Sequence, residues 1–223
     1  MRNITYVSIA LAGEKLQKIG QRLQGVRDID DFYLSLVSEW KTPEELVMTG
    51  HEPETLLLNR EKWPQLERAE ERMMYLDAMT YLPDDILCKV DRAAMGVSLE
   101  TRVPFLDYRV VELAWRFPLQ MKIRDNQGKW PLRQLLYKYV PKELIERPKQ
   151  GFAVPLGEWL RGPLRDWAEQ LLDPVRLTAE GYFRPEPIRQ KWQEHLSEKY
   201  NREYSLWSVL MFQACLETQQ EKS

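Results

Sequence analysis

Residues 81–109 read YLPDDILCKVDRAAMGVSLETRVPFLDYR, and the rest of the sequence is interpreted around this stretch. Acidic and basic side chains alternate in it with apolar ones, in a pattern that predicts a helix followed by an extended turn, both otherwise buried. Charged groups among buried apolar residues need an opposite charge or a ligand beside them. We therefore expect this stretch to line a site, with residues 146–152 (ERPKQGF) as its other wall.

The composition restricts the classes of function. A chain of 223 residues is long enough for one domain over residues 1–223, with a core at 65–217 and a weaker helical lead-in at 1–64. The net charge of −2 gives no positive field for nucleic acid or an anionic membrane. Because the sequence has no membrane-length apolar run, no signal-peptide pattern and two isolated cysteines, we expect a cytoplasmic protein with buried, reduced thiols.

Apolar residues recur at helical spacing along most of the chain, and no alternation of useful length indicates a strand. The sequence therefore predicts an all-α chain. Pro83 is expected to end one helix, and Asp84 or Asp85 to cap the next. Asp28 or Asp30 and Asp107 are expected to cap two further helices, residues 126–128 to form a turn, and Asp173 and Pro174 to lie in a linking segment. In the helix after Asp107, the residues expected to face inward are Val110, Val111, Ala114 and Phe117. The segments predicted to be helical are 1–25, 28–40, 42–50, 65–82, 86–97, 107–117, 132–139, 156–172, 186–199 and 203–217.

Several catalytic motifs are excluded. None of the ten glycines lies closer than five residues to another, so the sequence contains no GxGxxG loop, and the two pairs with phosphate-loop spacing lack the following Lys and Ser/Thr. It has no nucleophile elbow and no HExxH, and the two histidines have no metal-like neighbours, so we predict no metal site. Any phosphate chemistry in this chain would depend on Lys and Arg side chains.

Three groups of residues remain as candidates, each with a structural alternative. Asp85 and Lys89 have the i,i+4 spacing of a helical ion pair, beside Asp91 and Arg92, and could equally form a partly buried salt-bridge ladder. Glu100 and Arg102 project to the same side of an extended segment and could instead lock a turn. Lys149, between Pro148 and Gly151, could present its charge to a phosphate or lie in a solvated loop.

Three motifs occur in order along the chain: KVDRAAM at residues 89–95, LETRVPFLD at 99–107 and RPKQGF at 147–152. With them, the chain resembles the C-terminal part of the synthetase domain of glutamine-hydrolysing asparagine synthase. The resemblance extends from about Met73 onward and more faintly before it. It implies the helical C-terminal half of an adenine-nucleotide α-hydrolase-like (PP-loop ATPase) α/β domain, whose strands and phosphate loop are not in this sequence.

The resemblance also implies a reaction. Such enzymes use ATP and Mg²⁺ to convert a substrate carboxylate, aspartate by default, into an acyl-adenylate, which ammonia from glutamine converts to an amide. By this resemblance, Lys149 acts near the phosphates and Glu100 faces substrate, with Arg102 bracing the site. Asp85, Lys89, Asp91 and Arg92 fall in the segment where relatives bind the acceptor; for these four the spacing is ambiguous by one residue, so the assignment is to the segment and not residue by residue.

The family's N-terminal glutaminase, its SGGxDS loop and its acidic metal-binding segment are not found in the 223 residues. We therefore expect a fragment that binds no cofactor tightly, has little or no activity alone and exposes an apolar face, so that it forms a homodimer or aggregates. Two alternatives remain open. One is a free-standing helical binding module; the other is half of a split enzyme whose partner chain carries the phosphate loop.

Overall fold

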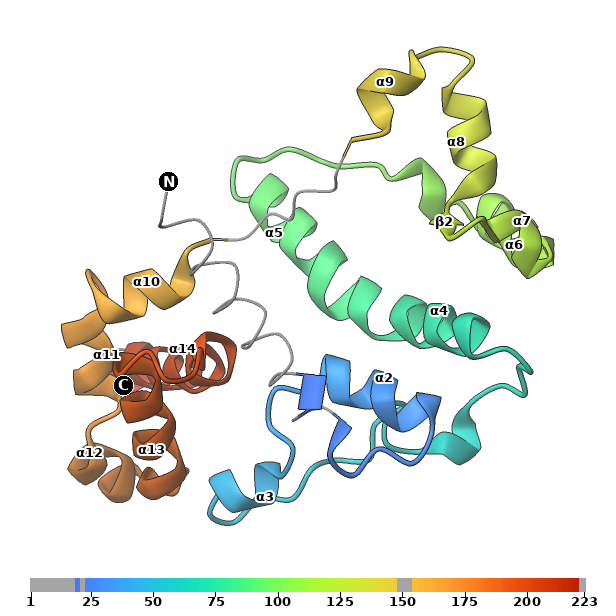
Figure 1. Cartoon of the computed structure of the whole chain (residues 1–223). Coiled ribbons are helices and arrows are strands. Elements are labelled where there is room, and N and C mark those ends of the chain that lie inside the picture. The colour runs from blue at the N-terminus through green and yellow to red at the C-terminus, as the bar shows by residue number, and fades with distance from the viewer. Residues whose placement is uncertain (1–18, 21–22, 148–153, 221–223) are drawn as a thin grey trace, which may run out of the picture. The chain divides into compact units, whose positions relative to one another are not determined.

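The structure is a computed structural model, which describes residues 19–20, 23–147 and 154–220. Its residues divide into two compact units (Figure 1). Unit 1 comprises Met1–Leu58 together with Ala153–Ser223, and unit 2 comprises Asn59–Phe152. The division into two units does not test the prediction that residues 1–223 form a single domain, so that organisation stays a prediction. Helices dominate the described part of the chain, where the named strands are two residues long each, and this confirms the all-α prediction.

Unit 1 is built from short and medium helices. Asp28 caps the first of them, since its side chain accepts a hydrogen bond from the Asp31 N–H at 2.7 Å, as the sequence predicts. Pro43 opens the second at its first position, but this helix stops well before Gly50. The helices of unit 1 are α2 (Ile29–Val37), α3 (Pro43–Leu46), α10 (Leu156–Arg161), α11 (Arg165–Leu171), α12 (Pro174–Glu180), α13 (Pro185–Leu196) and α14 (Glu203–Gln220).

Two predictions in unit 1 are wrong at helix ends. The single helix expected over residues 156–172 is broken at Gly162, where the backbone leaves helical geometry just before a proline that has no N–H to donate. Asp173 and Pro174, expected to form a linker, instead start α12. The Asp173 carboxylate accepts from the Arg176 N–H at 2.9 Å, and proline is favourable at the first helical position.

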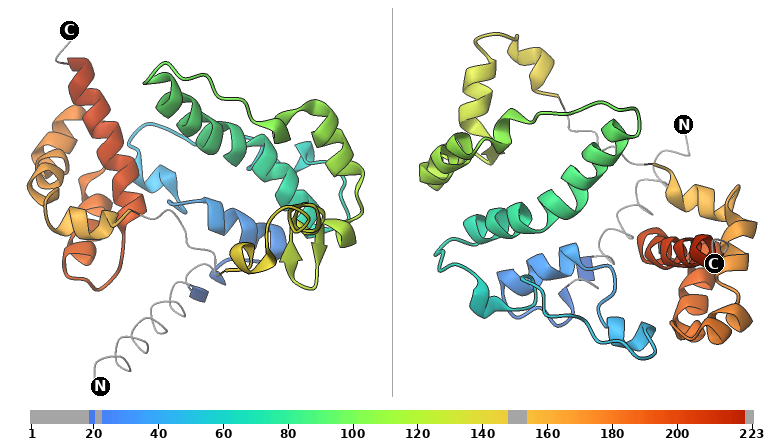
Figure 2. Two further views of the ribbon diagram at one scale, coloured as in Figure 1. Left: turned by 90° about the horizontal axis from the view of Figure 1, so that it is seen from above. Right: turned by 180° about the vertical axis from the view of Figure 1, so that it is seen from behind.

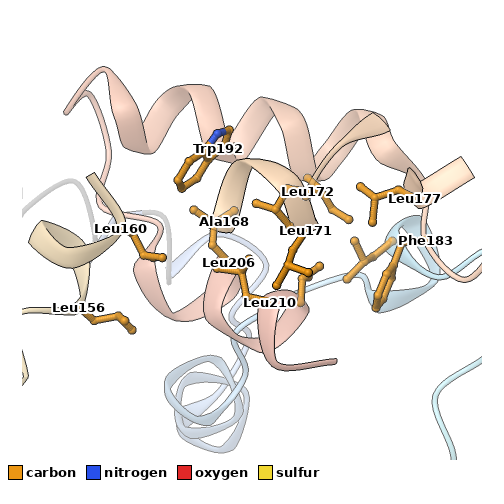
Figure 3. Packing of buried hydrophobic residues seen from close by; sticks show 13 residues of the cluster. Leu156, Leu160, Ala168, Leu171, Leu172, Leu177, Phe183, Trp192, Leu206 and Leu210 are labelled. Carbon is orange, nitrogen blue, oxygen red and sulfur yellow. The ribbon is translucent and has the colours of Figure 1, made fainter. Parts of the chain in front are cut away.

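The core of unit 1 lies between α10, α11, α13 and α14 (Figure 3). Trp192 on α13 and Leu206 on α14 are completely buried, and Phe183 packs edge-to-face on Phe212 with ring centroids 5.0 Å apart. The cluster consists of Leu46, Leu156, Leu160, Ala168, Leu171, Leu172, Leu177, Phe183, Ile188, Trp192, Leu206, Val209 and Leu210.

The N-terminal part of unit 1 is attached to these helices by backbone hydrogen bonds. The N–H of Met48 donates to the carbonyl of Tyr182 at 2.9 Å, and the N–H of Arg184 to that of Leu46 at 2.8 Å. The indole N–H of Trp40 donates to the carbonyl of Ser205 at 3.1 Å. Segments more than 130 residues apart in the sequence therefore form one body.

After the short helix η1 (Arg60–Lys62), unit 2 continues as a long helical path that passes through Pro83 (Figures 1 and 2). The path consists of α4 (Ala69–Met79), the π-helix η2 (Leu82–Leu87) and α5 (Cys88–Met95). The prediction that Pro83 ends a helix is therefore wrong, as is the capping role of Asp84 or Asp85. The wider π-helical turn accommodates the proline ring and tolerates the hydrogen bond that proline cannot donate. The chain therefore continues in helical geometry.

The rest of unit 2 contains the predicted cap at Asp107 and a turn that comes one residue earlier than the predicted 126–128. Asp107 caps α6, and the two-residue turn Asp125–Asn126, both with positive φ, joins strands that pair Ile123 with Gly128. Lys129, also with positive φ, precedes α8. The remaining elements are η3 (Pro104–Leu106), α6 (Tyr108–Arg116), α7 (Leu119–Lys122), β1 (Ile123–Arg124), β2 (Gln127–Gly128), α8 (Trp130–Leu136) and α9 (Lys142–Ile145).

Unit 2 buries few apolar side chains. Leu76 and Ala94 are its buried hydrophobic residues among those described. Of the four residues expected to face inward in the helix after Asp107, Val110, Val111 and Ala114 are exposed, and Phe117 is half-buried. The expectation of a buried stretch at 81–109 is also wrong, because most of its helix ends and its extended turn are exposed, and among the described residues its buried hydrophobic side chain is that of Ala94. Its exposed large apolar side chains are Tyr81, Ile86, Val90, Met95, Val97, Leu99, Val103, Phe105, Leu106 and Tyr108.

Two smaller expectations can be compared with the structure. Both cysteines are free thiols, as predicted, but Cys88 is only partly buried and Cys215 is exposed, because α14 turns that side away from the core. Among the helices that the structure describes, none is long and apolar enough to cross a membrane.

Candidate functional site

The predicted site residues fall in one part of unit 2, with one exception. Asp85 lies in η2, Lys89, Asp91 and Arg92 in α5, and Glu100 with Arg102 in the extended segment before η3. Lys149 lies outside the described residues.

Asp85 and Lys89 form the ion pair that their spacing predicts. The hydrogen bond from Lys89 to Asp85 raises the pKa of the lysine. The Lys89 side chain is nevertheless 72% exposed and that of Asp85 34%. The pair therefore lies at the surface, and the alternative of a partly buried salt-bridge ladder does not describe it.

Asp91 and Arg92 are exposed on α5, and neither forms a side-chain ion pair or hydrogen bond with another described residue. Lys89 and Arg92 are three residues apart on the same helix, so their side chains share one face, while Asp91 projects to another. Two cations close together on an exposed helical face can bind a carboxylate or a phosphate, whereas Asp91 is not placed to neutralise both.

Glu100 and Arg102 contact each other across the extended segment, with 2.6 Å between Arg102 Nη2 and Glu100 Oε1. Their side chains are 70% and 82% exposed, respectively. The pairing agrees with the alternative of an ion pair that locks a turn. Solvent screening makes such an exposed pair weak, so the Glu100 carboxylate stays available to other partners.

The stretch ends at a well-fixed helix start. The Asp107 carboxylate accepts from the backbone N–H of Arg109 at 2.9 Å and from its guanidinium at 2.6 Å. The guanidinium bond is the larger cause that lowers the pKa of Asp107. This cap holds α6 in register with the segment that carries Glu100 and Arg102.

A hydrogen-bonded group that the sequence did not reveal fixes the chain next to the RPKQGF motif. Arg133 on α8 and Tyr137, the residue that follows the end of α8, both donate to the Glu146 carboxylate, and Arg133 Nε also donates to the carbonyl of Gly128 at 3.1 Å. The hydrogen bond from Tyr137, followed by the charge and hydrogen bond of Arg133, lowers the pKa of Glu146. Helical spacing could have paired Arg133 with Tyr137, but not with Glu146, which comes after α9.

The described residues contain no group of three or more His, Cys, Asp or Glu that could hold a metal ion. His195 is the buried histidine. Its Nδ1 accepts from the Arg202 N–H at 3.3 Å, and its Nε2 lies 3.2 Å from the carbonyl of Gly157. Burial and the nearby charge of Arg161 lower the pKa of His195. Because Nδ1 accepts from a backbone N–H, the geometry suits a proton on Nε2 that is donated to Gly157, and the ring joins α13 to α10.

The similarity to known proteins covers both units. A family model described as asparagine synthase matches residues 8–217. This chain belongs to the asparagine synthase family. The matched range contains every candidate residue, Lys149 included, and the resemblance of the three motifs is thereby confirmed at the level of the family.

Individual members of the family give the extent of the match. Asparagine synthetase [glutamine-hydrolyzing] 1 of Bacillus subtilis is 33% identical over 141 residues, which is 63% of this chain and 22% of that protein. A putative asparagine synthetase of Mycobacterium tuberculosis H37Rv is 37% identical over 142 residues, with the same coverage. The asparagine synthetase of Gallus gallus is 30% identical over 189 residues, 77% of this chain and 33% of that protein.

The chain thus spans about a fifth of the length of the first two of these relatives. No solved structure matches it.

Proposed function

We propose that this chain is the C-terminal, helical part of the synthetase domain of an ATP-dependent amidotransferase of the asparagine synthase type. The observation that carries the proposal is the family match over residues 8–217, which includes the three motifs in their order. The curated relatives are named as glutamine-hydrolysing asparagine synthetases. The proposed domain is a PP-loop ATPase fold, and this chain supplies its helical half.

In the proposed reaction, ATP with Mg²⁺ activates a carboxylate, aspartate by default, as an acyl-adenylate. Ammonia from glutamine then displaces AMP and leaves an amide. Lys149 would place its ammonium near the phosphates, where a fixed positive charge stabilises the charge that develops in the transition state. Charge stabilisation of this kind typically contributes about 10²–10³ in rate.

Glu100 is the second proposed catalytic residue. Its carboxylate is exposed and held by Arg102 at 2.6 Å, which suits a group that faces substrate while its neighbour braces it. Asp85, Lys89, Asp91 and Arg92 would belong to the acceptor-binding segment, in which the adjacent cations Lys89 and Arg92 suit the carboxylates of aspartate.

The chain's own residues fit only part of a nucleotide site. Its cations suit phosphate, but the sequence has no glycine-rich loop, and the described residues hold no acidic cluster for Mg²⁺. In the complete enzyme, ATP and Mg²⁺ would therefore be held largely by regions outside these 223 residues. We expect the chain alone to bind nucleotide weakly and to show little or no activity.

A chimera tests the proposal. Residues 8–217 replace the matching region of the B. subtilis asparagine synthetase, and aspartate-dependent ATP–pyrophosphate exchange and asparagine formation are measured. We expect both activities in the chimera and a loss of about 10²–10³ in exchange rate on Lys149→Ala or Glu100→Ala. Lys138→Ala, which removes an exposed lysine outside the motifs, is the matched control and should leave the rate unchanged.

A chimera that folds but lacks both activities would overturn the proposed function. Full exchange in the Lys149→Ala chimera would overturn only the role of that lysine. The isolated chain is assayed alongside, alone and mixed with a polypeptide that carries the phosphate loop. Activity only in the mixture would indicate the split enzyme, and exchange by the chain alone at an ordinary enzymatic rate would contradict the expectation that it is inactive alone.

A further inference from the structure

Unit 1 contains an open cleft of about 590 Å³, far in sequence from the motifs of unit 2. One wall is the segment from Ser38 to Leu46, with Trp40 at its centre. The other wall is α13 and the turn that leads into α14. The volume lies within the usual range of small-molecule sites, about 300–1,000 Å³.

Lys191 on α13 lies in this cleft, and its ammonium is held in place by an aromatic ring. Its Nζ is 4.5 Å from the centroid of the Trp40 ring. The ring is itself fixed, because its indole N–H donates to the carbonyl of Ser205 at 3.1 Å and to Ser208 Oγ at 3.2 Å. The ammonium is half-buried, and no carboxylate of a described residue lies within ion-pair distance of it.

The carboxylates near Lys191 are engaged elsewhere or lie at the rim. Glu194 accepts from Arg202 at 2.8 Å and from Gln190 at 3.0 Å. Glu203 points toward α10, since a Cβ added at Gly157 would meet its Oε2 at 2.7 Å. Glu39 is exposed.

Burial, and then the charge of Arg202, lowers the pKa of Lys191, against the opposing effect of Glu194 and Glu39. A half-buried ammonium without a close counter-ion is stabilised when an anion is placed beside it. Lys41 and Lys199 also line the cleft, and their charges are opposed there by the exposed carboxylates of Glu39 and Glu45.

We propose that this cleft binds a small oxyanion, with its carboxylate or phosphate group on the ammonium of Lys191. The anion would be the counter-ion of Lys191, which no carboxylate of a described residue provides. The side-chain amides of Gln190 and Asn201, which also line the cleft, would donate hydrogen bonds to it. The residues that line this cleft belong to unit 1, whereas the proposed synthetase residues belong to unit 2.

The experiment titrates the full chain with sodium phosphate and, separately, with sodium acetate, at ionic strength held constant with sodium chloride. Binding is followed through the indole N–H resonance of Trp40, assigned with Trp40→Phe. We expect saturable shifts, with an affinity at least about tenfold weaker in Lys191→Met, which keeps the apolar stem over Trp40 but removes the charge. Lys122→Met is the matched control, because Lys122 also lies over an indole, that of Trp115, at 4.9 Å.

Saturation by phosphate alone would restrict the ligand to phosphates, and saturation by both salts would support any small oxyanion. Linear, unsaturable shifts would overturn the proposal, as would equal weakening by Lys191→Met and Lys122→Met. Should Lys191→Met fail to fold, the lysine side-chain resonances of the wild-type chain provide the test. The Lys191 signal should move on addition of phosphate and the Lys122 signal should not; equal movement would contradict the site.

Discussion

The two units of this chain differ in what they do with apolar side chains. Unit 1 buries Trp192, Ile188, Leu206 and Leu210 completely between its helices. Unit 2 also has amphipathic helices but leaves Leu113 on α6 at 53% exposure and Leu135 on α8 at 51%. An apolar helical face in the sequence therefore predicts that the helix packs against something. It does not predict that the packing partner lies among the described residues.

The difference has a consequence for stability. Burial of a large apolar side chain contributes about 1.5–3 kcal/mol, so the core of unit 1 can offset the conformational entropy of its own folding. Unit 2 depends more on backbone hydrogen bonds, exposed ion pairs and the network around Glu146. In the proposed function, the remainder of the synthetase domain would pack on the exposed apolar side chains of unit 2.

The largest expected effect is in the core of unit 1. Trp192→Ala should lower the free energy of unfolding by about 3–5 kcal/mol, because the cavity left between α11, α13 and α14 cannot collapse fully. Urea denaturation followed by circular dichroism measures the change. Leu144→Ala in unit 2, where the side chain is 63% exposed, is the control and should change stability by at most about 0.5 kcal/mol. An equal loss of stability in the two variants would contradict the idea that unit 1 has a packed core and unit 2 does not.

The exposed apolar side chains of unit 2 should promote self-association of the chain. We expect the wild-type chain to dimerise or aggregate at micromolar concentration, and the triple variant Leu113→Ser, Tyr139→Ser, Leu144→Ser to raise the dissociation constant at least about tenfold. Light scattering over a concentration series is the measurement. Val175→Ser, at 77% exposure in unit 1, is the control that should have no effect. A wild-type chain that stays monomeric would contradict this expectation.

Two ion pairs with the same helical spacing compare the units directly. Arg176 and Glu180 in unit 1 are 2.8 Å apart, with side chains 24% and 13% exposed, and Glu180 also accepts from Gln213. Arg176→Gln should cost about 1–2 kcal/mol, because it leaves a poorly solvated carboxylate without its cation. Lys89→Gln, in the exposed pair of unit 2, should produce no resolvable change in the thermal midpoint. A larger loss from Lys89→Gln would indicate that α5 is buried in solution.

The smallest expected effect is a pH dependence from His195. Since its folded-state pKa lies below the ordinary value of 6.5, the unfolded chain binds more protons, and stability falls as the pH drops below about 6.5. The slope is at most about 1.4 kcal/mol per pH unit. Denaturation between about pH 5 and 7 measures it. His195→Gln should flatten the slope, and His51→Gln, at an exposed position, should not; stability that rises on acidification would contradict the assignment.

Local features of this protein could be predicted from the sequence. The helix caps at Asp28 and Asp107, the turn before Gly128 and the pairing of Asp85 with Lys89 all depend on residues within four positions of each other. The passage of a helix through Pro83 could not be predicted, because the proline penalty applies to α-helical geometry and the chain avoids it with a π-helical turn.

The same division holds for the sites. The order of the three motifs, a property of the sequence alone, was enough to indicate the asparagine synthase family. Only the tertiary structure decided which apolar side chains are covered. It also decided that Arg133 donates to Glu146 and that Lys191 lies over Trp40. Trp40 and Lys191 are about 150 residues apart, and no local pattern in the sequence specifies that their side chains meet, since only the packing of α13 against the N-terminal segment brings them together.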